Sequence, residues 1–120
     1  MDIMFKSTRG DKNYVTASQA IVQGIANDGG LFVPETIPTI DFPLEKITEM
    51  SYQELAYEVL KLILTDYTEE ELKYCINSAY DEKFDTKLIA PLVSAGNGNF
   101  LELFHGKTIA FKDMALFYSS

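Results

Sequence analysis

The sequence contains three places where a Ser or Thr is followed three residues later by Gln or Glu, just ahead of regularly spaced apolar residues. The three pairs are Thr16 with Gln19, Ser51 with Glu54, and Thr68 with Glu71. In such a capping box the hydroxyl accepts the backbone N–H three residues on, and the longer side chain reaches back to the capping residue. The pairs therefore predict the first turns of three helices within a chain of 120 residues.

The apolar residues after each pair recur every three or four positions, which places them on one face of a helix. The first stripe is Ala17, Ala20, Ile21, Gly24 and Ile25. The second stripe is Tyr52, Leu55, Ala56, Val59, Leu60 and Ile63. The third stripe is Leu72, Cys75, Ile76, Ala79 and Tyr80. The Asn-Asp-Gly-Gly segment at 27–30 is expected to end the first helix, because Gly tolerates a left-handed backbone. Residues 65–67 form a short link, so we expect the other two helices to be an antiparallel pair.

Short apolar segments between polar turns predict strands in both halves of the chain. In the first half we expect strands at 3–6, 14–15 and 31–33, the last stopped by Pro34, which has no backbone N–H. Further on, the sequence predicts an extended segment, a loop, a strand, a turn and the start of a helix. These elements are expected at 88–93, 94–99, 100–104, 105–108 and 109–118, with Phe111, Ala115 and Tyr118 on one helix face.

Composition excludes several classes of protein. The chain has 10 Lys and Arg against 18 Asp and Glu, so its net charge of −8 opposes nucleic-acid binding. One Cys and one His cannot form a disulfide scaffold or a closed Cys/His zinc site, so we expect no metal. No apolar run is long enough to span a membrane, and the N-terminus lacks the features of a signal peptide. We therefore expect a cytoplasmic protein with no membrane partner.

Two local patterns suggest chemistry but have simpler explanations. Cys75 and His105 are the only candidates for a Cys–His pair, yet Cys75 lies on a helix stripe, where a buried structural role is the usual one. Gly106-Lys107-Thr108 resembles the end of a phosphate-binding loop. That loop needs another Gly five residues earlier, and position 101 is Leu.

Lys112 is the remaining candidate for a reactive side chain. It follows a strand and a Gly turn, at the expected start of an apolar helix, between bulky apolar residues. The positive helix end and apolar neighbours both disfavour a charged amine, and a neutral amine is what Schiff-base formation requires. A surface Lys that lays its stem over apolar residues explains the spacing equally well.

Residues 101–113, Leu-Glu-Leu-Phe-His-Gly-Lys-Thr-Ile-Ala-Phe-Lys-Asp, closely resemble a motif of the threonine synthase family, roughly L-E-L-F-H-G-P-T-x-A-F-K-D. Ser-Thr-Arg-Gly at 7–10 and Ser-Gln-Ala-Ile-Val-Gln-Gly-Ile-Ala-Asn-Asp-Gly-Gly-Leu-Phe-Val-Pro at 18–34 resemble the family's N-terminal domain. Residues 50–56 fit the segment that follows. The sequence departs from the family at Lys107, where Pro is usual, which leaves the stiffness of that turn open.

The resemblance implies an enzyme that uses pyridoxal 5'-phosphate to convert O-phospho-L-homoserine and water to L-threonine and phosphate. Lys112 matches the family's cofactor lysine and would hold the cofactor as a Schiff base and then move protons. Phe111 and Asp113 flank Lys112 and would orient the lysine and contact the cofactor. His105 would either line the site or hold the turn through hydrogen bonds to the backbone, and we favour the second role.

The resemblance also implies an α/β (α+β) architecture in two parts. Residues 1–87 would form the small N-terminal accessory domain of short strands with three helices. Residues 88–120 would supply the first strand and helix of a fold-type II pyridoxal-phosphate domain. Because family members are several hundred residues long, we expect this chain to be an N-terminal fragment, inactive alone. Two alternatives stay open: a non-catalytic interaction module based on the helix pair, and another pyridoxal-phosphate lyase of the same fold.

Overall fold

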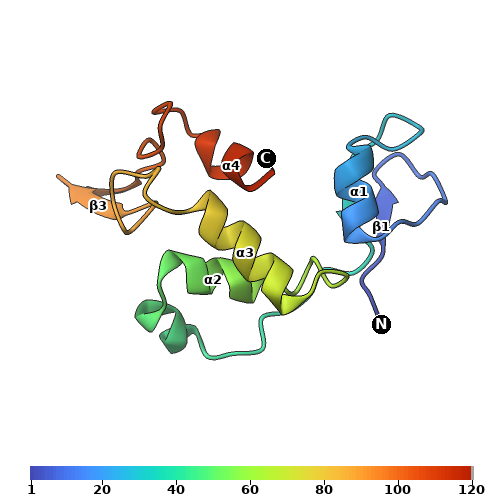
Figure 1. The fold of residues 1–120 in the computed structure, drawn as a ribbon, viewed down its shortest axis with the longest axis horizontal. Helices are drawn as coiled ribbons and strands as arrows, with labels where there is room; N and C mark the ends of the chain where they lie inside the picture. The colour runs from blue at the N-terminus through green and yellow to red at the C-terminus, as the bar shows by residue number, and fades with distance from the viewer. Residues whose placement is uncertain (120) are drawn as a thin grey trace. The chain divides into compact units, whose positions relative to one another are not determined.

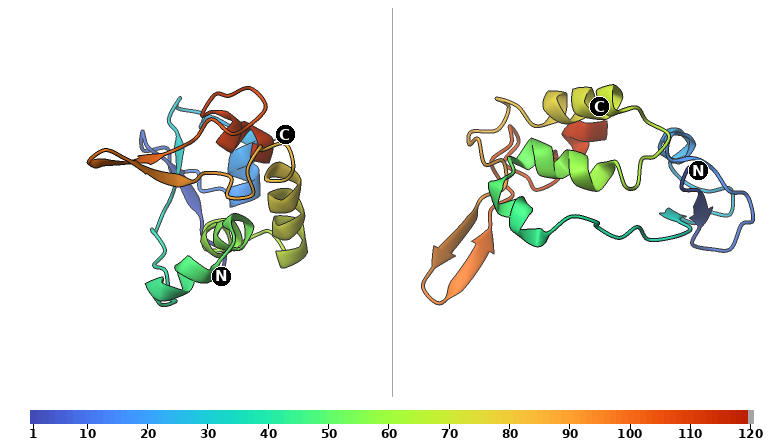
Figure 2. Two further views of the ribbon diagram at one scale, coloured as in Figure 1. Left: turned by 90° about the vertical axis from the view of Figure 1, so that its left-hand side faces the viewer. Right: turned by 90° about the horizontal axis from the view of Figure 1, so that it is seen from below.

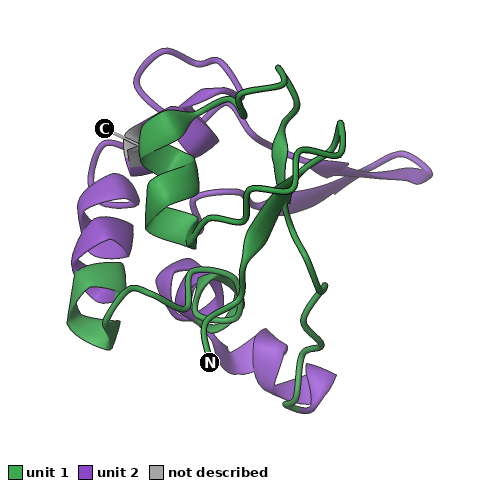
Figure 3. Ribbon diagram, turned by 90° about the vertical axis from the view of Figure 1, so that its right-hand side faces the viewer, with its two compact units in different colours: residues 1–42, 58–72 green, residues 43–57, 73–120 purple. Residues whose placement is uncertain are grey.

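The computed structural model describes residues 1–119 and combines helices with two small antiparallel sheets (Figure 1). This confirms the mixed α and β architecture expected from the sequence. The chain forms two compact units (Figure 3): residues 1–42 with 58–72, and residues 43–57 with 73–120. This division follows contacts rather than chain order, and the expected boundary after residue 87 stays a prediction.

The first unit contains a two-stranded sheet, one whole helix, the end of a second helix and the start of a third. Strand β1 (Phe5–Ser7) pairs antiparallel with β2 (Phe32–Pro34), with Phe5 opposite Pro34. We expected Pro34 to follow the strand, but it is the last residue of β2. Pro has no backbone N–H to donate, and an edge position of a sheet does not require one. The strand expected at 14–15 is reduced to a single bridge between Val15 and Phe5.

Helix α1 (Ala17–Gln23) begins at Thr16 with the capping box that the sequence predicts. It ends earlier than expected, at Gly24, whose positive φ of 76° breaks the helix before the segment 27–30 is reached. The predicted apolar stripe is therefore only partly buried. Ala17 and Ala20 are buried, whereas Ile21 and Ile25 are 52% and 60% exposed.

A 3₁₀ helix, η1 (Leu44–Glu49), opens the second unit and was not expected. It follows Pro43 and has no side-chain cap and no buried residue, so the sequence holds little signal for it. The unit also contains the first part of helix α2 (Tyr52–Leu60) and most of helix α3 (Glu69–Ala79). Among residues 1–119, no helix has the length and apolar character needed to cross a membrane.

Helices α2 and α3 are antiparallel, as expected. Gln53, near the start of α2, donates a hydrogen bond of 2.6 Å to the carbonyl of Tyr80, the residue after α3. Further along both helices, the Lys73 ammonium lies 5.1 Å from the centroid of the Tyr57 ring. The stripe of α3 is largely buried, with Cys75 half-buried, but α2 has no buried residue and its Val59 is 38% exposed.

Residues expected to form a loop at 94–99 belong mostly to a β-hairpin. Strand β3 (Leu92–Ala95) pairs with β4 (Gly98–Leu101), and Figure 2 shows the two as a ribbon in orange. Gly96 has a φ of 59° at the first position of the two-residue turn, which is what a tight type II′ hairpin turn requires. Strand β4 consequently lies two residues earlier than expected, and the segment 102–104 is not a strand.

Candidate functional site

The turn ahead of the last helix is held by a buried carboxylate. Asp113 is 1% exposed, and its Oδ2 accepts the backbone N–H of Thr108 at 2.8 Å while Oδ1 accepts the Thr108 hydroxyl. A Cβ at Gly106 would overlap the Asp113 side chain, so only Gly fits there. These contacts stiffen the turn even though Lys107 replaces the Pro that the resemblance leads one to expect.

Helix α4 (Asp113–Ser119) begins four residues later than the sequence predicts. Ile109 has a positive φ of 65°, which is incompatible with a right-handed helix and forces the chain into a turn through residue 112. Lys112 is therefore the last turn residue and not a helix residue. Its carbonyl still accepts the first α4 bond, from the N–H of Leu116 at 2.9 Å.

Lys112 is exposed, and among residues 1–119 its ammonium has no hydrogen bond or ion pair. Its neighbour Phe111 is 65% exposed, so the apolar surroundings expected of the lysine are incomplete within this chain. A primary amine in its neutral form can condense with an aldehyde.

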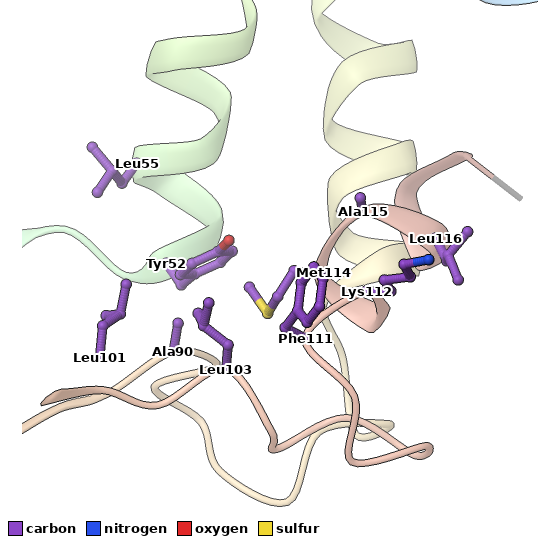
Figure 4. Close-up of a pocket in the computed structure, with 10 residues that line it drawn as sticks. All are labelled: Tyr52, Leu55, Ala90, Leu101, Leu103, Phe111, Lys112, Met114, Ala115 and Leu116. Carbon is purple, nitrogen blue, oxygen red and sulfur yellow. The ribbon is translucent and has the colours of Figure 1, made fainter.

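Lys112 lines a pocket of about 760 Å³ in the second unit (Figure 4). Figure 4 shows the Lys112 nitrogen on the side of Leu116, away from the Tyr52 ring. The residues around the pocket are Tyr52, Leu55, Ala90, Leu101, Leu103, Phe111, Lys112, Met114, Ala115 and Leu116. Its volume falls in the range of small-molecule sites, and apolar lining is the usual character of such sites.

The lining suits one part of pyridoxal phosphate and not another. The Lys112 amine can bond the aldehyde carbon, and apolar side chains such as Met114 can cover the flat ring. The Tyr52 hydroxyl and the Lys112 amine are the polar side-chain groups among the described lining residues. Phosphate groups are commonly held by a cluster of backbone N–H groups, and these two side chains are not such a cluster. Among residues 1–119, the pocket lining thus offers one amine able to bond an aldehyde and little polar side-chain surface for a phosphate.

His105 does not line the pocket and lies between two carboxylates. Its Nε2 is 2.7 Å from Oε2 of Glu102, and its Nδ1 pairs with Oδ1 of Asp85. The hydrogen bond to Glu102, with that to Asp85, raises the pKa of His105 above its ordinary value. The backbone N–H of Asp85 also donates to the His105 carbonyl at 3.0 Å. His105 thus connects Asp85 to the segment before Lys112. We expected hydrogen bonds between His105 and the backbone, whereas its ring pairs with the carboxylates of Asp85 and Glu102.

The described residues do not bring the other suggested groups together. Cys75 makes no bond to His105, both of whose ring nitrogens already face carboxylates. No group of three potential metal ligands among residues 1–119 is arranged to hold an ion. Asp113 contacts Thr108 rather than the pocket, so a direct contact between Asp113 and a cofactor stays a prediction.

The Ser-Thr-Arg-Gly segment, by contrast, meets the Asp-Gly-Gly segment within the first unit. Asp28 Oδ1 accepts the Ser7 hydroxyl at 2.6 Å and the Gly30 N–H at 2.9 Å. The hydrogen bond from Ser7, followed by that from Gly30, lowers the pKa of Asp28. Arg9 adds a bond of 3.2 Å from Nη1 to the Asp28 carbonyl. The two motifs therefore form one locked pair of loops beside the β1–β2 sheet.

The family model described as threonine synthase N terminus matches residues 4–80, more than half of the chain. The chain belongs to the threonine synthase family. Among curated threonine synthases, that of Schizosaccharomyces pombe is 40% identical over 118 residues, covering 95% of this chain and 23% of the relative. The threonine synthase-like 2 protein of Homo sapiens is 37% identical over 116 residues, covering 93% of this chain and 24% of its own.

Two solved threonine synthase structures share the fold. The yeast enzyme superposes with a TM-score of 0.88 at 35% identity, over 98% of this chain and 25% of the yeast chain. The pyridoxal-phosphate-bound enzyme of Brucella melitensis gives a TM-score of 0.86 at 34% identity, over 98% of this chain and 26% of its own. The chain thus spans about a quarter of the length of these threonine synthases.

The sequence pattern does not distinguish several residues at or beside this site. Tyr52 and Tyr80 belong to the apolar stripes of helices, and Met114 follows no pattern that marks it. A Tyr within an apolar stripe indicates only that its hydroxyl needs a hydrogen-bond partner when the ring is buried. Which partner it finds depends on elements distant in sequence.

Proposed function

We propose that this chain is the N-terminal part of a threonine synthase that converts O-phospho-L-homoserine and water to L-threonine and phosphate. The observation that carries the proposal is Lys112, which lines an apolar pocket and has no side-chain partner within residues 1–119, in a chain of this family. The names of the relatives support the reaction, and the pyridoxal-phosphate-bound structure from Brucella melitensis supports the cofactor. A cytoplasmic location and action on a small molecule without nucleic acid follow as parts of the same proposal.

In this proposal Lys112 binds the cofactor through its amine and afterwards moves protons at the substrate carbons. When bound, pyridoxal phosphate supplies an electron sink for carbanions next to the amino group. Phe111 and Met114 contribute apolar surface to the pocket that the cofactor ring would contact. Asp113 fixes the turn that carries the lysine, and the phosphate is held by parts of the enzyme outside residues 1–119.

The test is a comparison of two Lys→Ala variants in the full-length protein supplied with pyridoxal phosphate. Lys112→Ala is expected to abolish threonine formation from O-phospho-L-homoserine and to remove the cofactor that borohydride traps on the wild-type peptide. Lys87→Ala is the matched control, because Lys87 is also exposed in the second unit and does not line the pocket. Threonine formation that survives in Lys112→Ala would contradict the proposal.

A related reaction is the second candidate, because a threonine synthase-like 2 protein also matches the chain. Cofactor trapped on Lys112 without threonine formation would favour another pyridoxal-phosphate reaction. Absence of cofactor from the full-length protein would favour a non-catalytic interaction module.

The expected inactivity of residues 1–120 alone is part of the proposal, because the described pocket lining offers a phosphate only the side chains of Tyr52 and Lys112 as polar partners. Adding pyridoxal phosphate to the 120-residue chain and recording the trapped fraction tests it. Stoichiometric trapping on Lys112 at micromolar cofactor would contradict the lack of a cofactor site, and threonine formation by this chain would contradict its inactivity.

A further inference from the structure

Tyr80 connects helix α3 to the first turn of helix α4. Its hydroxyl donates a hydrogen bond of 2.7 Å to the backbone carbonyl of Met114, 34 residues further along the chain. Tyr80 is 8% exposed and directly follows α3, where its own N–H donates to the Ile76 carbonyl at 2.9 Å. The donor is thus a buried side chain at the end of a well-anchored helix.

The position of Tyr80 is fixed at both its ring and its backbone. The ring meets Tyr52 edge-on with centroids 4.9 Å apart, and it stacks on Tyr118 of α4 at 6.5 Å. The amide of Gln53 donates to the Tyr80 carbonyl at 2.6 Å. A side chain restrained in this way loses little further entropy when its hydroxyl forms a hydrogen bond.

The effect of this bond reaches Lys112 through the backbone. Met114 is two residues after Lys112, and its N–H donates to the Phe111 carbonyl at 3.2 Å. The Lys112 carbonyl accepts the N–H groups of Ala115 and Leu116 at 3.1 and 2.9 Å. Helix α4 has seven residues, too few to be stable through its own hydrogen bonds, so tertiary contacts decide where its first turn lies.

We propose that Tyr80 is a positioning residue for Lys112, holding the lysine-bearing turn in place from the end of helix α3. The proposal rests on the proposed function, in which Lys112 binds the cofactor. It adds that a residue of the N-terminal segment matched by the family model sets the place of the reactive amine.

The test compares Tyr80→Phe with Tyr74→Phe in the full-length protein. Both variants remove one hydroxyl from α3 or its end, but Tyr74 is 73% exposed and its hydroxyl makes no hydrogen bond within residues 1–119. Tyr80→Phe keeps the ring packing, so it is expected to fold. Gln53→Met removes the hydrogen bond to the Tyr80 carbonyl. This second variant is expected to change the same readouts in the same direction as Tyr80→Phe.

Two readouts separate positioning from a general loss of stability. Without cofactor, the amides of Ala115 and Leu116 are expected to exchange hydrogen about fivefold faster in Tyr80→Phe than in Tyr74→Phe. With excess pyridoxal phosphate, borohydride trapping on Lys112 is expected to be slower, and kcat to fall on the order of tenfold with little change in KM.

Equal exchange at Ala115 and Leu116 in the two variants would overturn the proposal, whether or not cofactor binds. Faster exchange with unchanged trapping rate and kcat would also overturn it, since Tyr80 would then have a structural role alone. If the wild-type protein binds no cofactor, the proposed function fails, and with it the role of Tyr80 for a reactive lysine. The exchange difference would then report only on the turn.

Discussion

Nε2 of His105 lies 2.7 Å from Oε2 of Glu102, and the other ring nitrogen pairs with Asp85, so the imidazole is held between two carboxylates. Both hydrogen bonds favour the protonated ring, which is why the pKa of His105 is raised. A raised folded-state pKa adds stability that is fully present below the unfolded value, near 6.5, and lost as pH rises through the folded value.

We expect Glu102→Gln to lower the pKa of His105. The free energy of unfolding should then fall less as pH rises from about 6.5 through the folded-state pKa. The chain has one histidine, so its ring proton signals in an NMR titration belong to His105. Glu82→Gln is the control, because Glu82 is exposed and is not among the groups that shift His105. An unchanged titration midpoint in Glu102→Gln would contradict the arrangement.

Asp113 is expected to stabilise the turn before Lys112. Asp113→Asn replaces one acceptor oxygen by an NH₂ group facing either the Thr108 N–H or its hydroxyl, so one buried bond is lost. The free energy of unfolding should fall by about 1–3 kcal/mol in denaturant titrations. Thr108→Val, which removes only the hydroxyl, should cost less. A larger loss in Thr108→Val than in Asp113→Asn would show that the carboxylate is not the centre of the turn.

Gly30 is expected to tolerate no side chain. A Cβ there would overlap the Ser7 hydroxyl and lie 3.0 Å from both Asp28 Oδ1 and the backbone nitrogen of Arg9. Gly30→Ala should therefore reduce the free energy of unfolding by about 1–3 kcal/mol. At Gly98 the nearest atoms belong to the movable end of the Phe100 ring, at 3.2 Å, so Gly98→Ala is the control. Equal stability of the two variants would argue against the locked loops.

The capping box of α3 predicts a measurable response to acid. The backbone N–H of Thr68, followed by its hydroxyl, donates to Glu71 and lowers the pKa of that carboxyl. The resulting stability is present above the ordinary value and is lost as pH falls through the folded-state pKa. Thr68→Ala should cost about 1 kcal/mol at neutral pH and raise the pKa of Glu71. An unshifted Glu71 titration in the variant, followed by NMR, would contradict this reading of the cap.

Local signals in the sequence determined the starts of α1, α2 and α3, because a capping box involves residues only three positions apart. The Thr16–Gln19 box and the paired bonds of Ser51 with Glu54 and Thr68 with Glu71 are all present. The family motifs likewise identified Lys112 as the candidate reactive residue. Such information is carried by the order of residues and does not depend on what packs against them.

Tertiary structure decided the features that depend on distant partners. The exposure of Ile21 and Ile25, the hairpin at 92–101 and the late start of α4 after Ile109 could not be inferred from apolar spacing alone. The pairing of His105 with Asp85 and of Tyr80 with Met114 joins residues 20 and 34 positions apart. A buried polar group must find a partner, but the fold alone determines which one lies within reach.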